Sequence, residues 1–211
     1  MVRWSAFTRA DVRAMDAQVQ ALMDTLHALA APSWPAQATD AALDQLTRDL
    51  ILHQRHDIPN LAPGSWCIAP DLVGMDADAR FDLILLPTLV ALGVLNLVRH
   101  HRPHLAAQHP RLRQAITHGL QFVALRGLTG PGYDADPGLF TSVELLHLGG
   151  LPETLSTDPS LSPPAYQHLQ TTAADLAHRL ANDLTRGPWN TDFTSNIRTA
   201  LAQLSPVLPN A

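Results

Sequence analysis

Lysine is absent from the sequence, so all 14 of its basic residues are arginine. This absence excludes chemistry that needs an amine side chain, such as the Schiff base of pyridoxal enzymes or the phosphate-binding lysine of a P-loop. The single cysteine, Cys67, excludes a disulfide within the chain and a thiolate zinc cluster. Neither a GxSxG nor a GxGxxG motif occurs, so the composition and these motifs assign no reaction.

Long apolar runs are also missing. The longest, from Leu83 to Val98, is interrupted by Pro87 and by polar residues, and is shorter than the ~20 residues that span a bilayer. The N-terminal segment contains no apolar signal core. These features predict a cytoplasmic protein with no membrane partner. With 211 residues, 46% of them hydrophobic, the chain is expected to form a single domain over residues 1–211.

Apolar residues recur at helical spacing through most of the chain. Helices are predicted over residues 8–30, 39–54, 78–101, 110–126, 139–148, 163–185 and 193–204. Thr39 is the expected N-cap of the second, and Pro87 either kinks the third or starts a new helix there. Residues 55–78 are predicted to form a long loop, and residues 102–109 a solvated connection. Because no segment alternates with the period of a strand, the predicted fold class is all-α.

Two segments, residues 48–66 and 118–133, place an apolar helix end before a glycine-x-aromatic turn. Gln54, Gly64 and Trp66 in the first segment, with Gly119 and Tyr133 in the second, resemble parts of the helical-hairpin repeat of α/α-toroid proteins, the squalene-cyclase and prenyltransferase class. The resemblance implies about seven helices in stacked antiparallel hairpins, a partial toroid-like array whose open ends a homodimer would cover. The acid-rich motif and zinc site of that class have no counterpart here, so no cofactor is expected.

The same resemblance implies that the turns bearing Trp66 and Tyr133 emerge at one end of the bundle. Together they would form a loop-lined cleft for a small sugar- or isoprenoid-like ligand, or for a protein partner. The residues expected to hold the ligand are Trp66, Tyr133 and Arg126. Those expected to carry any catalysis are Asp134, Asp136 and His56.

Residues 83–133 contain five arginines, five histidines and no acid, whereas the rest of the chain holds all 19 acidic residues. Such a charge distribution suits an anionic ligand or internal partners of opposite sign, for which Asp71, Asp76, Asp78 and Asp82 are expected. The net charge of −5 and the lack of a groove-reading motif predict no nucleic-acid partner.

An alternative function starts from His56 and Asp57. This pair resembles the His-Asp pair of HD-domain phosphohydrolases, all-helical proteins that bind a divalent metal through a histidine, the pair and a later aspartate. The resemblance implies a metal site formed by His27, His56, Asp57 and Asp175. Neutral imidazoles would bind the metal while the carboxylates offset its charge.

Overall fold

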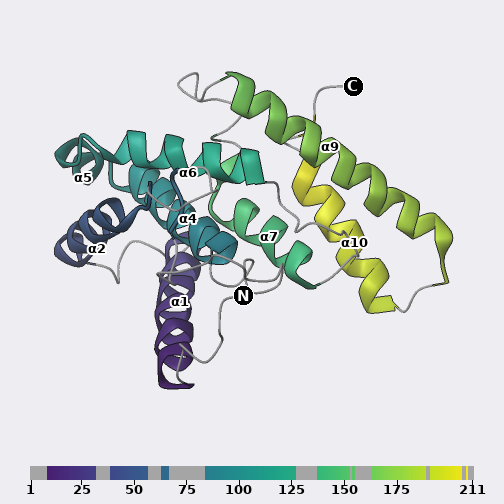
Figure 1. Ribbon diagram of the computed structural model, residues 1–211, viewed down its shortest axis with the longest axis horizontal. Coiled ribbons are helices and arrows are strands. Elements are labelled where there is room, and N and C mark those ends of the chain that lie inside the picture. The colour runs from purple at the N-terminus through teal and green to yellow at the C-terminus, as the bar shows by residue number, and fades with distance from the viewer. Residues whose placement is uncertain are drawn as a thin grey trace, which may run out of the picture.

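The computed structural model describes residues 9–31, 39–56, 63–66, 84–126, 137–152, 154, 163–188, 191–205 and 208 (Figure 1). These residues form the helices α1 (Arg9–Ala30), α2 (Asp40–His53), α4 (Leu86–His101), α5 (Pro103–Gln108), α6 (Leu112–Arg126), α7 (Pro137–Leu148), α9 (Pro163–Arg186) and α10 (Thr191–Leu204). Within the described ranges there is no strand, and one isolated bridge joins Arg55 and Ser65. The all-α prediction is therefore confirmed.

Local sequence signals set several helix boundaries. The Thr39 hydroxyl accepts a hydrogen bond from the backbone N–H of Ala42 at 3.3 Å, which caps α2 as expected. Pro87 lies in the first turn of α4, and the two residues before that helix, Ile84 and Leu85, form a π-helical turn. Another proline, Pro137, begins α7 two residues earlier than predicted. Proline suits this position because the first N–H groups of a helix have no partner within the helix.

Residues 102–109 form a largely exposed connection between α4 and α6, as predicted, but most of the connection is helical. This segment contains the six-residue helix α5, with a proline in its first turn, and its Leu105 is buried. Leu105 anchors this short helix to the core, and the half-buried Ala106 packs beside it. The periodicity of apolar residues could not reveal this helix, because so short an apolar segment defines no period.

Helix α4 is the centre of the fold (Figure 1). Every residue from Pro87 to Val98 is buried, and α4 contacts α1, α2, α5, α6 and α7. A helix covered on all sides has no solvent-facing stripe, which explains why this segment is apolar around its whole circumference. No helix in the described ranges, α4 included, is long and apolar enough to cross a membrane.

Glycines allow α4 to approach the C-terminal end of α7 and one side of α1. A Cβ atom on Gly149 would lie 2.6 Å from the Cα of Gly93, and one on Gly93 would lie 2.8 Å from Cδ1 of Leu26. The first contact is between backbones, so it cannot be relieved by moving a flexible side chain. Close packing of α4 and α7 therefore requires the glycine at position 149.

A buried asparagine on α4 donates hydrogen bonds to the backbone oxygens that follow α7. The side chain of Asn96 donates from Nδ2 to the backbone oxygens of Gly149 and Gly150, at 2.8 and 3.3 Å. Its Oδ1 accepts hydrogen bonds from Thr154 at 3.0 Å and from Arg99 at 3.1 Å. The last carbonyls of a helix lack partners within the helix, and here α4 supplies one. These hydrogen bonds from Asn96 hold the C-terminal end of α7 against α4.

We expect Gly149→Ala to lower the free energy of unfolding by about 3 kcal/mol, because the added methyl group overpacks a backbone contact. Gly150→Ala is the matched control: its Cβ would meet no atom closer than 3.6 Å, and its φ of +62° costs an alanine about 1 kcal/mol. Urea denaturation of both variants measures the difference. Equal losses would contradict the close approach of α4 and α7.

Candidate ligand-binding cleft

A cleft of about 680 Å³ lies between α2 and α6. It is lined by Arg48, Ile51, Leu52, Gln54, His56, Arg111, Gln114, Ala115 and His118. The lining residues of each helix are spaced by three and four, so each wall is a single helical face. The volume is within the range of small-molecule sites in proteins.

Gln54, just after α2, ties the following loop to α6. Its side chain is almost fully buried, and Nε2 donates to the backbone oxygens of Gly64, at 3.0 Å, and Ala115, at 2.8 Å. Backbone hydrogen bonds between Arg55 and Ser65 and between Gly64 and Arg55, both 2.7 Å, close the same turn. Both amide hydrogens are thus used, which fixes the orientation of the side chain and one end of the cleft.

The loop lies directly on α6 at His118. Gly64 has a φ of +109°, and a Cβ atom there would lie 2.3 Å from the backbone oxygen of His118. Only glycine combines this conformation with this approach. The turn therefore brings His56, which precedes it, close to His118 on α6.

His56 and His118 form an edge-to-face pair, with ring centroids 5.2 Å apart and an interplanar angle of 80°. The pKa of His118 is lowered from its ordinary value of 6.5, first by burial and then by the positive charge that His56 carries when protonated. His118 is consequently neutral at pH 7. A neutral imidazole can accept a proton when a negative charge arrives beside it.

The charged residues that line the cleft, as far as the structure describes them, are all basic. Arg48 donates to Oδ2 of Asp44 at 2.6 Å, and Oδ1 of Asp44 accepts a hydrogen bond from Nε2 of His109 at 2.7 Å. Arg111 is exposed, and no described carboxylate pairs with it. Among the residues that the structure describes, neither aspartate nor glutamate contributes to the lining, so this part of the cleft attracts anions.

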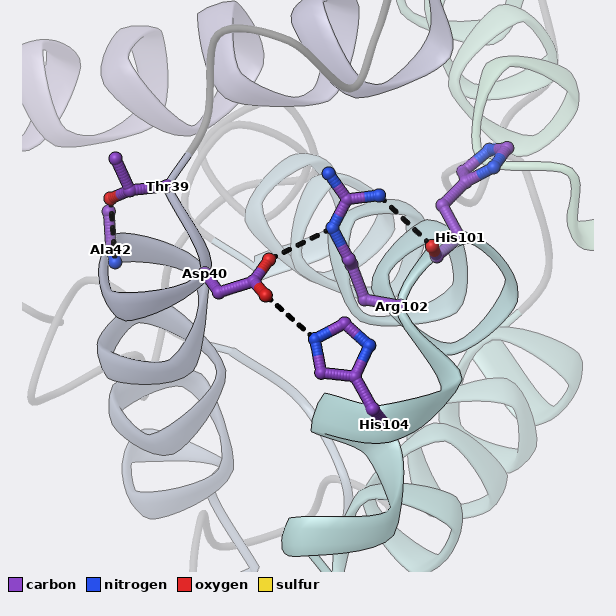
Figure 2. Close-up of polar contacts among 6 residues, drawn as sticks. All are labelled: Thr39, Asp40, Ala42, His101, Arg102 and His104. Atoms are coloured by element: carbon purple, nitrogen blue, oxygen red, sulfur yellow. Dashed lines mark hydrogen bonds and ion pairs between the residues drawn. The ribbon is translucent and has the colours of Figure 1, made fainter.

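Part of the acid-free segment is neutralised by α2 (Figure 2). Asp40 accepts hydrogen bonds from Nε2 of His104 at 2.8 Å and from Nε of Arg102 at 3.0 Å. These partners, His104 foremost, hold the pKa of the Asp40 carboxyl below its ordinary value. The aspartates expected to pair with this segment, at positions 71, 76, 78 and 82, lie outside the described residues. The internal partners that the structure shows are therefore Asp40 and, through His109, Asp44.

Of the residues predicted to form a site, His56 lines the cleft and Trp66 does not. Trp66 is 5% exposed, and its indole N–H donates to the backbone oxygen of Leu50 at 2.7 Å. Its ring packs so closely on Gly119 that a Cβ atom there would lie 2.8 Å from Cζ3. The expectation of an open aromatic wall at Trp66 is corrected accordingly, since the ring is a core element.

The structure does not describe the side chains of several other predicted site residues. Tyr133, Asp134, Asp136 and Asp57 lie outside the described residues, and Arg126 ends α6 with its side chain undescribed. Their roles stay predictions.

The metal alternative combines residues from separate helices. His27 is exposed on α1 and Asp175 is exposed on α9. Among the described residues, no three histidine, cysteine or acidic side chains are grouped to hold a metal. The four-residue site also needs Asp57, so it stays a prediction.

Sequence reasoning missed the basic residues opposite His56. Arg111 and His118 are seven positions apart in the sequence, a spacing that places two residues on one helical face. Both belong to the acid-free segment that the sequence singled out. That spacing was a usable signal, whereas nothing in the sequence paired them with Arg48, 63 positions before Arg111.

We expect NMR titration of the His118 imidazole to give a pKa below 6.5, and His56→Gln to raise it, because a positive neighbour is removed. Burial of His118 persists, so the pKa should stay below 6.5. His147→Gln, on a helix outside the cleft, is the control. Since protonation of His118 is disfavoured in the folded state, its contribution to stability should be lost as the pH falls below 6.5. An unchanged pKa in His56→Gln would contradict the coupling of the rings.

Comparison with known proteins adds no second line of inference. No family model, no curated protein and no solved structure matches this chain. The likeness to α/α-toroid repeats stays a prediction from the sequence.

Proposed function

We propose that the protein binds a small molecule bearing an anionic group in the cleft between α2 and α6. The supporting observation is the lining, which gathers Arg48, Arg111, His56 and His118 and, within the described ranges, includes no acidic side chain. Arginine and histidine are strong donors to carboxylate and phosphate oxygens. A basic concave surface also raises the local concentration of anions.

Arg111 is the main anion-binding group in this proposal. Arg48 already donates to Asp44, so part of its charge is offset. Arg111 is exposed and pairs with no described carboxylate. A guanidinium presents parallel donors that match the two oxygens of a carboxylate or phosphate.

The apolar part of the lining sets a second requirement on the ligand. Ile51 and Leu52 come from α2, and Leu52 is 75% exposed. An aliphatic segment covering these side chains would remove apolar surface from water. An anion with a hydrocarbon part therefore fits this lining, and it narrows the sugar- or isoprenoid-like ligand expected from the sequence.

The HD-type phosphohydrolase stays the alternative, because His56 lies in a cleft suited to phosphate. It makes a different prediction: the purified protein should contain one equivalent of a divalent metal, and His56→Ala should lose it. Elemental analysis of both proteins distinguishes the two functions. A metal-free protein that binds anions would support the proposal and remove the hydrolase.

The proposal is tested by calorimetric titration with octanoate and with inorganic phosphate at low ionic strength. We expect Arg111→Gln to weaken octanoate binding about tenfold, the effect of losing one charged hydrogen-bonding partner. Arg198→Gln, which removes an exposed arginine on α10, should leave the affinity unchanged. Equal effects of the two variants, or no binding of either anion to the unaltered protein, would refute an anion site in this cleft.

A further inference from the structure

The two walls of the cleft carry their residues in the same order. On α2 and the residues after it, an arginine is followed by aliphatic residues and then by glutamine and histidine. On the α6 side, an arginine is followed by glutamine and alanine and then by histidine. In sequence order these are Arg48, Ile51, Leu52, Gln54 and His56 on one wall, and Arg111, Gln114, Ala115 and His118 on the other.

Contacts between the walls show that corresponding ends lie together. Asp44, one turn before Arg48, bonds His109, which lies just ahead of α6. Gln54, at the other end of α2, bonds the backbone of Ala115 within α6. The cleft therefore has an arginine end and a histidine end.

An apolar stretch separates these ends. From Arg111 to His118 the helical rise amounts to about 10 Å along the axis. Ile51 and Leu52 on one wall and Ala115 on the other occupy this interval. The lining is thus basic at both ends and aliphatic in the middle.

From this order we infer that the ligand carries an anionic group at each end of a short aliphatic chain, one held by Arg111 and the other by His56 and His118. The inference rests on the proposed anion site and specifies the class of its ligand. A ligand with a single anionic group would occupy the arginine end and leave the histidines without a partner.

Protonation distinguishes the two modes of binding. His118 is neutral in the free protein, because burial and the charge of His56 lower its pKa. Arg48 and Arg111, the arginines of the lining, are positive. Asp44 is outside the lining and accepts a hydrogen bond from Arg48. The helices α4 and α9 also pack on α6, and none of their described residues adds a charged side chain to the lining. Among the described lining residues no negative charge faces His118, so we expect the second anionic group of the ligand to supply one, and its binding to take up a proton.

The test compares suberate with octanoate, which have the same chain length but two and one carboxylates. Calorimetry near pH 6.5 in two buffers of different ionisation enthalpy measures affinity and proton uptake together. We expect suberate to bind about tenfold more tightly than octanoate and with proton uptake, whereas octanoate takes up none. Suberate affinity should increase as the pH falls from about 8 to about 6, as the histidine becomes charged. Succinate, which is too short to reach both ends, should bind no more tightly than octanoate.

Two variants complete the test. His118→Gln should reduce suberate affinity to that of octanoate and abolish proton uptake, while octanoate affinity is retained. His147→Gln should change neither ligand, and retained octanoate binding shows that the His118 variant is folded. If suberate and octanoate bind the unaltered protein equally and without proton uptake, the two-ended ligand is refuted while the anion site stands. If neither ligand binds, both proposals fail.

Discussion

The side-chain amide of Gln54 is the contact on which the cleft depends. Its two hydrogens bind carbonyl oxygens that belong to different parts of the chain, Gly64 in the loop and Ala115 in α6. A buried carbonyl left without a partner costs about 1–3 kcal/mol, so the loop is stabilised in one position. The indole N–H of Trp66 also holds the chain after Gly64 against α2, because it donates a hydrogen bond to the backbone oxygen of Leu50. The approach of the two histidines follows from the position of this loop.

The basic residues of the acid-free segment, residues 83–133, have two different roles, which depend on whether an acidic residue lies beside them. Asp40 and Asp44 on α2 bind Arg102, His104 and His109, which join α5 to the rest of the fold. The His104–Asp40 pair is exposed on both sides and contributes little to stability, whereas the His109–Asp44 pair is mostly buried. Two residues after His109, Arg111 lies just before α6 and lines the cleft, where none of the described residues is acidic. A single basic segment thus supplies both a helix contact and a cleft wall.

Much of the fold could be predicted because apolar spacing and proline positions mark helices locally. The repeat-like match also grouped Gln54, Gly64 and Trp66, which do lie together. It failed to give the role of the tryptophan, because a ring in a proline- and glycine-rich loop can turn into the core as readily as toward a ligand. The cleft was beyond sequence reasoning for another reason. Arg48 and Arg111 line the same cleft because α2 and α6 pack on α4 and on each other, and no local pattern contains that packing.

The same helices that line the cleft also form the core, and this limits how far its walls can move. On α2, Leu43 and Leu50 are buried, whereas Arg48 and Leu52 face the cleft on the adjoining side. On α6, Ile116 is buried next to the cleft residue Ala115. Opening either wall would expose these apolar side chains, at about 25 cal/mol for each Å². Packing therefore keeps the spacing between the arginine end and the histidine end fixed before a ligand arrives. Binding to such a preformed site requires little ordering of the protein, so ligands are selected by whether their anionic groups match that spacing.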